Sequence, residues 1–138
     1  MRRDLEIARQ RLKQRNLTLV VVKRGKVIFE TGAHGISGLL KAIEELDGKM
    51  RGSSVADRIV GRAAALLCVY SGVVAVFAIT ASDGGIEVLL ENHVSLEFEH
   101  NVPCIMDCKG TDVCPFEKLA SSFSSPIEAY EGLKAACS

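Results

Sequence analysis

The feature that most constrains the fold of this chain is an unbroken apolar run over residues 73–79. A strand that is apolar on both faces needs helices on both sides, so the run predicts a strand in the middle of a sheet. The stretch just before it predicts a helix that starts with Ser54 as its N-cap, runs to about Tyr70 and stops at Ser71–Gly72. A capped helix leading into a buried strand is therefore the predicted centre of the fold.

Upstream of this centre the sequence predicts a helix, a β-hairpin and a second helix. The first helix covers residues 4–14 and has its first residue as N-cap. Two β-branched runs, 17–22 and 27–30, lie on either side of Arg24-Gly25, a two-residue turn that suits antiparallel strands. Apolar residues then recur at helical spacing over residues 36–46, which predicts an amphipathic helix.

Downstream of the central strand, strands and helices continue to alternate. Ser82–Gly85 predicts a capped turn into a helix over residues 86–92, and residues 94–99 alternate between apolar and acidic or polar side chains, as in a strand near a sheet edge. Two further helices are predicted over 115–122 and 126–136, each with proline at its start. The whole pattern predicts an α/β fold of three layers, α-β-α, with a mixed sheet of four or five strands and a leading antiparallel hairpin.

Composition limits the classes of function. The 138 residues suit one domain over 1–138, and equal numbers of basic and acidic residues, 17 of each, give no positive field for nucleic acid. The apolar runs are too short to span a membrane and the N-terminus lacks the apolar core of a signal peptide, so we expect a cytoplasmic protein. Its five cysteines are then interpreted as thiols rather than as a disulfide framework.

Polar residues near the predicted strand ends are the candidate ligand-binding residues, because ligands of open α/β sheets bind beyond the carboxyl ends of the strands. Asp57 lies in the first turn of the predicted central helix, where it either faces a cleft or complements the helix dipole. Arg58 and Arg62 are one helical turn apart and either hold a phosphate or carboxylate, or form a solvated face with salt bridges. Ser82 and Asp83 open the next helix and could present backbone N–H groups to an anion, or simply cap that helix.

The densest chemical feature is a group of three cysteines, Cys104, Cys108 and Cys114. Their spacing, C-x3-C-x5-C, matches no common structural zinc site, so no metal site is predicted, although zinc binding and a disulfide both remain open. Cys114 precedes Pro115 and Glu117, so it is the expected N-cap of a helix, where the dipole would favour the thiolate. Cys114 and Glu117, with Asp57, are the candidate catalytic residues; the alternative is that the cysteines are small packed thiols.

Two segments, Ser54–Ala65 and Gly110–Glu117, resemble an uncharacterised prokaryotic domain family whose fold is similar to that of cytidine deaminases. The resemblance covers nearly the whole chain and implies a mixed sheet with a leading hairpin between layers of helices. Deaminases of that fold bind zinc through H-x-E or C-x-E at the start of the helix after the hairpin, and through P-C-x-x-C at the start of the next crossover helix. Those motifs would fall at Ala56–Arg58 and Ser82–Gly85, which contain no His, Cys or Glu. The resemblance thus implies a deaminase-like cleft without hydrolytic deamination.

Three functions follow as hypotheses. The first is the binding of a small-molecule or nucleotide-like ligand near Asp57, Arg58, Ser82–Asp83 and the Cys114–Glu117 segment. The second is thiol chemistry, with Cys114 as nucleophile or redox centre and Cys104 or Cys108 as its resolving partner. The third is a non-enzymatic interaction module or homo-oligomer. The sequence identifies no cofactor.

Overall fold

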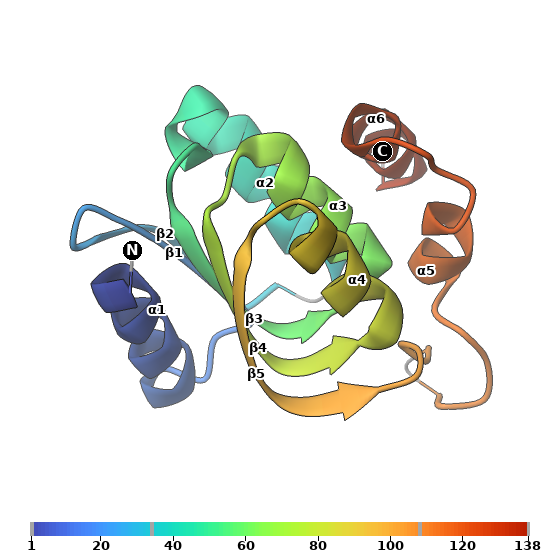
Figure 1. Ribbon diagram of the computed structural model, residues 1–138, viewed down its shortest axis with the longest axis horizontal. Coiled ribbons are helices and arrows are strands. Elements are labelled where there is room, and N and C mark those ends of the chain that lie inside the picture. The colour runs from blue at the N-terminus through green and yellow to red at the C-terminus, as the bar shows by residue number, and fades with distance from the viewer. Residues whose placement is uncertain (1, 34, 108, 138) are drawn as a thin grey trace.

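The computed structural model of the protein describes residues 2–33, 35–107 and 109–137. Within these residues one sheet of five strands is formed, in the order β2-β1-β3-β4-β5 (Figure 1). β1 is antiparallel to both of its neighbours, whereas β3, β4 and β5 are parallel to one another. The strands are β1 (Leu19–Lys23), β2 (Lys26–Thr31), β3 (Ser54–Val60), β4 (Ala75–Ser82) and β5 (Ser95–Val102). This is the predicted mixed sheet with its leading antiparallel hairpin.

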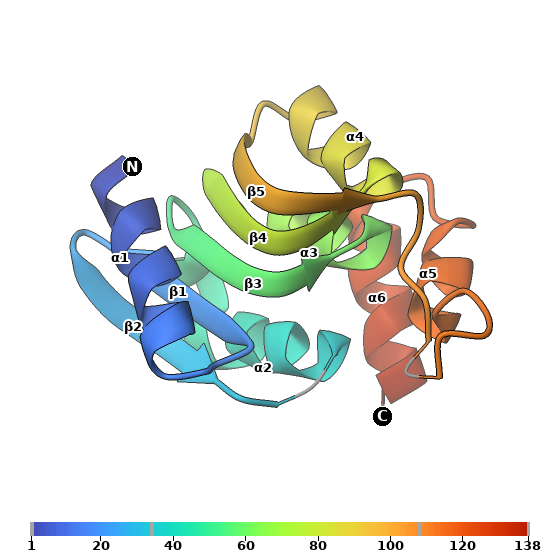
Figure 2. The ribbon, with the colours of Figure 1, turned by 90° about the horizontal axis from the view of Figure 1, so that it is seen from below.

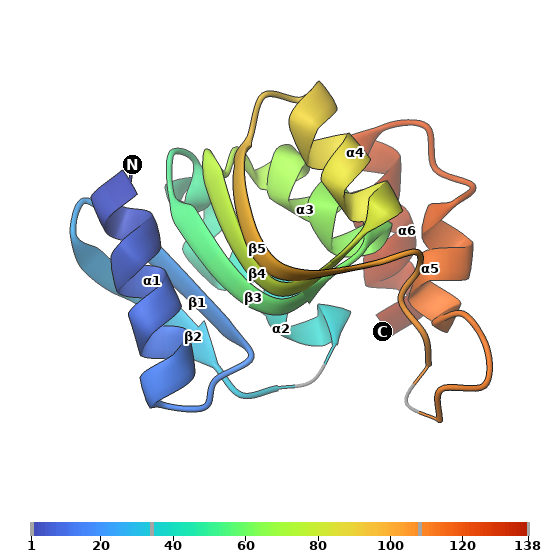
Figure 3. The same cartoon turned by 60° about the horizontal axis from the view of Figure 1, so that its bottom comes forward.

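Helices cover both faces of the sheet, which confirms the three-layer prediction. α1 lies alone on one face, and α2, α3 and α4 lie on the other (Figures 1 and 2). The last two helices pack outside α3, so they add to the second helical layer (Figure 3). The helices are α1 (Arg2–Gln14), α2 (Ile36–Leu46), α3 (Arg62–Ser71), α4 (Asp83–Glu91), α5 (Pro115–Ala120) and α6 (Pro126–Cys137), with one 3₁₀ turn at Asp47–Met50. No helix in the described ranges is both long and apolar enough to cross a membrane.

The predicted central strand is confirmed as β4, which lies between β3 and β5. Its side chains enter two separate cores because successive residues of a strand point to opposite faces. Ala75 and Phe77 pack with α1, whereas Val76 and Ala78 pack in the larger core with α2 and α3. A strand that is buried on both faces has no polar side, which is why residues 73–79 are all apolar.

Residues 54–60 form a strand, so the predicted helix from Ser54 is wrong in its first half. The spacing of apolar residues in this segment suits a helix or a strand, and the sheet decides the outcome. β3 pairs with β1 on one side and β4 on the other, and places Val55 in one core and Ala56 in the other. α3 begins only at Arg62, after Gly61, and ends at Ser71 before a left-handed Gly72. The predicted helix end is therefore confirmed.

The predicted hairpin is confirmed, but Asp4 does not cap its own helix. Arg24 and Gly25 both have positive φ, 51° and 78°, as a type I′ turn requires. α1 begins two residues before Asp4, and the Asp4 carboxylate accepts the backbone N–H groups of Arg24 and Gly25 at 3.0 and 2.8 Å. Asp4 therefore fastens the start of α1 to the hairpin turn.

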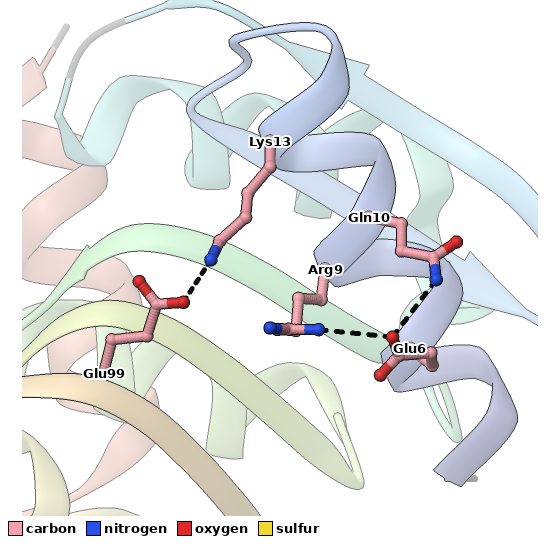
Figure 4. A network of polar contacts seen from close by, with 5 residues as sticks. All are labelled: Glu6, Arg9, Gln10, Lys13 and Glu99. Atoms are coloured by element: carbon pink, nitrogen blue, oxygen red, sulfur yellow. Dashed lines mark hydrogen bonds and ion pairs between the residues drawn. The ribbon is translucent and has the colours of Figure 1, made fainter.

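The middle and the end of α1 carry a network of polar contacts above the sheet (Figure 4). Lys13 forms an ion pair with Glu99 of β5, and this ion pair lowers the pKa of Glu99 below its usual range. Arg9 donates to Glu6 at 3.2 Å, and the side chains of Arg9 and Lys13 both lie over the ring of Phe77. Arg9 and Lys13 thus add polar and cation–π contacts to the apolar packing of α1 on the sheet.

Candidate functional site at the carboxyl edge of the parallel strands

The candidate site lies where β3 and β4 end and α3 and α4 begin. Gly85 in the first turn of α4 makes this junction tight: a Cβ atom there would lie 2.7 Å from the carbonyl oxygen of Val60. The two helix starts are therefore neighbours, as a ligand site at this edge requires. Ala56–Arg58, the expected position of the first deaminase-like motif, lies inside β3 and not at a helix start, and the helix that directly follows the hairpin is α2. The expected position of that motif is thus wrong.

Glu117 caps the start of α3 from a distance of 55 residues along the chain. Its carboxylate accepts the backbone N–H of Arg62 at 2.7 Å and that of Ala63 at 3.0 Å. These N–H groups have no partner within the helix itself, and the helix dipole favours a negative charge there. Gly61 leaves the space that Glu117 occupies, because a Cβ on Gly61 would lie 2.1 Å from the carboxylate oxygen.

Arg62 fixes the other end of α5 to the same helix start. Its guanidinium donates to the carbonyl oxygens of Ala120 and Phe123 at 3.0 and 2.8 Å, at and just beyond the last turn of α5. Two of the predicted site residues, Arg62 and Glu117, are thus brought together, and both hold α5 against the start of α3.

Ser82 and Asp83 stand at the neighbouring start of α4. Ser82 is buried and its hydroxyl accepts the backbone N–H of Gly85 at 3.1 Å, so it is the N-cap of α4. Asp83 is exposed and its carboxylate accepts a hydrogen bond from the side-chain amide of Asn101 at 2.9 Å. Asn101, on β5, also donates to the carbonyl oxygen of Ala81 at 3.1 Å. Sequence reasoning missed Asn101, because only the pairing of β5 with β4 brings it to this edge.

Asp57 lies inside β3, on the face that α3 covers. Burial raises the pKa of this carboxyl from 3.8 to about 7, although hydrogen bonds from the backbone N–H groups of Ile59 and Arg58 act in the opposite direction. Burial, with the Asp57 charge as a smaller cause, also raises the pKa of the Cys68 thiol on α3 far above its usual range. A carboxyl group of this kind exchanges its proton near neutral pH, as general acids and bases do.

Arg58 points to the opposite face of the sheet, toward the end of α1. Its Nε donates to the carbonyl oxygen of Leu17 at 2.6 Å and its guanidinium donates to the side chain of Asn16 at 2.8 Å. Adjacent residues of a strand point to opposite faces, so Asp57 and Arg58 do not face a common ligand from within β3. Arg58 and Arg62 do not share a helical face as predicted, because Arg58 lies in β3 and Arg62 is the first residue of α3.

Cys114 is the N-cap residue of α5, as expected, and its side chain is half-buried. Its thiol makes no capping hydrogen bond to the helix. Cys104 is exposed and its sulfur lies 3.8 Å from the sulfur of Met106, while Cys108 lies outside the described residues. Neither Cys104 nor Cys114 is in a disulfide within the part of the chain that the structure describes.

Zinc does not fit the residues at the two helix starts. Arg62, Ala63 and Ala64 offer no zinc donor, and the Glu117 carboxylate beside them already accepts two backbone N–H groups. At the start of α4 the one acidic side chain, Asp83, accepts a hydrogen bond from Asn101. Across residues 2–33, 35–107 and 109–137, no group of three His, Cys, Asp or Glu side chains could hold a metal ion.

Two large hollows lie away from this edge. One has a volume of about 780 Å³ and lies beside the hairpin turn, where Arg24 and Arg51 are among the lining residues. The other, about 530 Å³, lies between α2, α3 and α6, and is lined in part by Tyr70 and Tyr130, whose rings stack with centroids 4.4 Å apart. Arg51 lines both hollows.

Comparison with solved structures identifies the fold class as that of the cytidine deaminases. The dCMP deaminase of cyanophage S-TIM5 superposes with a TM-score of 0.50 at 15% identity, over 72% of this chain and 94% of the deaminase. A diaminohydroxyphosphoribosylaminopyrimidine deaminase and 5-amino-6-(5-phosphoribosylamino)uracil reductase of Thermotoga maritima gives a TM-score of 0.51 at 17% identity. That match covers 74% of this chain but 33% of the longer protein.

The chain belongs to the domain family of unknown function DUF1893, whose model matches residues 7–136. A DUF1893 family protein of Thermotoga maritima has a TM-score of 0.89 at 23% identity, over 99% of this chain and 91% of the other. No curated protein matches the sequence. The resemblance found in the sequence, to an uncharacterised family of deaminase-like fold, is thereby confirmed.

Proposed function

We propose that this protein binds a small molecule of nucleoside type at the carboxyl edge of its parallel strands, without zinc-dependent deamination. The observation that carries the proposal is the Glu117 carboxylate at the start of α3. Deaminases of this fold place a zinc-binding motif at that helix start. Here the N–H groups at the start of α3 are capped by an acid of the same chain, which supports a chemistry other than zinc-dependent deamination.

A row of side chains across the sheet supports a ligand with a planar ring. Asp57 of β3 pairs with Ala78 of β4, which pairs in turn with Phe98 of β5, so the three side chains lie on one face. Phe98 is 43% exposed, an unusual position for a large aromatic side chain. An aromatic ring stacks on a base, and a carboxyl group with a pKa of about 7 can donate or accept a hydrogen bond at a base edge. Ser82 and Asp83 lie four and five residues beyond Ala78, at the carboxyl end of β4.

Uncharged nucleosides test the proposal, because they carry the base and sugar but no phosphate. We expect at least one of cytidine, uridine, adenosine and guanosine to raise the melting temperature of the wild-type protein by several degrees at millimolar concentration. Asp57→Asn and Phe98→Ala should abolish this shift, and Glu87→Gln, on the exposed side of α4, should keep it. A lack of any shift with all four nucleosides would contradict the proposal.

Thiol chemistry at Cys114 is the second candidate function, favoured by the position of this half-buried cysteine at the start of α5. A thiol at a helix N-terminus is more nucleophilic when the helix stabilises its thiolate. Alkylation at neutral pH followed by mass spectrometry compares Cys114 with the exposed Cys104 and Cys137. Faster alkylation of Cys114 than of both controls supports this function, and equal or slower alkylation contradicts it.

A further inference from the structure

A basic hollow lies at the end of the molecule opposite the carboxyl edge of the parallel strands. Its walls come from the start of α1, the hairpin turn and the loop before β3, and it has a volume of about 780 Å³. Figure 2 shows the start of α1 and the hairpin turn together, far from α5. Five of the lining side chains are cations and one is an acid: Arg3, Lys23, Arg24, Lys26 and Arg51, with Asp4.

The charge in this hollow is not balanced by the protein. Asp4 is the one acid that lines it, and both of its carboxylate oxygens already accept backbone N–H groups, from Arg24 and Gly25. Within the described residues none of the five cations forms an ion pair. By contrast, Arg9, Arg11 and Lys13 further along α1 pair with acids (Figure 4 shows the contacts of Arg9 and Lys13). Although the chain has equal numbers of basic and acidic residues, five cations with no ion pair among the described residues line this hollow. Of these, Lys23 donates to the carbonyl oxygen of Lys49 at 3.2 Å.

We propose that this hollow binds a small phosphate-bearing anion, with Arg24, Lys26 and Arg51 among its partners. Like charges around a concave surface repel one another and focus a positive potential into it, and an anion removes that repulsion. Arginine forms paired hydrogen bonds with phosphate oxygens, and the positive end of the α1 dipole adds to the field. The hollow has room for a chain of two or three phosphates, which would contact several cations at once.

This proposal does not depend on a nucleoside site at the other edge of the sheet. The ligand chemistry, a short chain of phosphates, can come from an inorganic polyphosphate or from a nucleotide. Calorimetric titration with inorganic tripolyphosphate, and separately with ATP, distinguishes these sources. Equal affinity for the two ligands supports recognition of phosphate alone, and tighter binding of ATP supports recognition of a nucleotide.

The decisive variant removes two charges and keeps the turn. In Arg24→Asn with Lys26→Gln, asparagine suits the positive φ of residue 24, so the hairpin should fold as before. We expect this double variant to bind tripolyphosphate at least tenfold more weakly than the wild-type protein. Arg15→Gln with Lys109→Gln removes the same charge from exposed positions outside the hollow, and should bind within twofold of the wild type.

Three results would overturn the proposal. One is no measurable binding of tripolyphosphate or ATP at 50 mM salt, where surface charges are weakly screened. Another is an equal loss of affinity in the control double variant, which would indicate attraction by overall charge. The third is much tighter binding of a single-stranded oligonucleotide, with an affinity that rises with its length, since the hollow would then belong to a nucleic-acid surface.

Discussion

The capping position of the Glu117 side chain depends on the glycine at position 61, because a side chain at that position would occupy the same space. Gly61 has an ordinary extended backbone, with φ of −102°, which any residue could adopt. Glycine is needed here because it leaves space beside the backbone. That space holds the carboxylate that caps α3. A glycine before a helix is commonly interpreted as a flexible or capping position, and here it is a site of close approach.

Gly61→Ala should destabilise the protein by about 2 kcal/mol, because the new methyl group displaces Glu117 and leaves two N–H groups of α3 uncapped. Glu117→Ala should have a cost of similar size for the same reason. In the Glu117→Ala background, however, Gly61→Ala should cost much less, since the clash has gone. Urea unfolding of the four proteins measures this double-mutant cycle. Equal costs of Gly61→Ala in both backgrounds would show that the contact is not the cause.

Asp57 should make the stability of the protein depend on pH between about 4 and 7. Its pKa is about 7 in the folded protein and near 3.8 when unfolded, so the folded state binds the extra proton in this window. The free energy of unfolding therefore falls as the pH rises, by up to about 4 kcal/mol from this group. Asp57→Asn should remove this fall, and Glu87→Gln should leave it in place. Urea unfolding at pH 5 and pH 8 checks it; a fall unchanged in Asp57→Asn would point to another group.

At the scale of elements, the sequence predicted every strand and helix whose signal is local. The hairpin follows from two β-branched runs and Arg24-Gly25, and α5 and α6 follow from prolines at their starts. The failure was at residues 54–60, where local spacing suits two structures and pairing with β1 and β4 decides. Of the predicted site residues, Arg62, Ser82 and Asp83 lie at one edge of the sheet, but their contacts are not predictable from the sequence. Glu117 accepts the backbone N–H of Arg62, 55 residues earlier in the chain, and no local sequence pattern predicts a contact over that separation.

The packing of α6 on the segment after α5 gives a prediction at the same scale. Gly132 lies inside α6, where alanine would normally favour the helix by about 1 kcal/mol. A Cβ on Gly132 would lie 2.3 Å from the ring of Phe123, so Gly132→Ala should lower the free energy of unfolding instead.

The matched test of that contact is Gly132→Ala in a Phe123→Ala background. With the ring removed, the alanine should stabilise the protein, so the sign of the effect reverses. Thermal or urea unfolding measures both effects. Stabilisation by Gly132→Ala in the otherwise wild-type protein would mean that the Phe123 ring moves aside at little cost.

For the molecule as a whole, the fold of a deaminase and the chemistry of a deaminase are separate properties. Purified without chelator, the protein should contain far less than one zinc ion per chain, and EDTA should leave its melting temperature unchanged. It should also fail to convert cytidine or dCMP into the uracil product in an absorbance assay. One zinc per chain, or a melting temperature that falls with EDTA, would show that a metal stabilises this structure.

The long-range cap of α3 also has a consequence for how the chain is made. Domains emerge from the ribosome from the N-terminus onward, so α3 and the three parallel strands are synthesised before residue 117 appears. Until then the first turn of the helix at the centre of the larger core lacks its carboxylate. A nascent chain that ends near residue 110 should therefore have a frayed start of α3, with fast amide exchange at residues 62 and 63. The N-terminal cap of α3 thus forms only after the last quarter of the protein has begun to be synthesised.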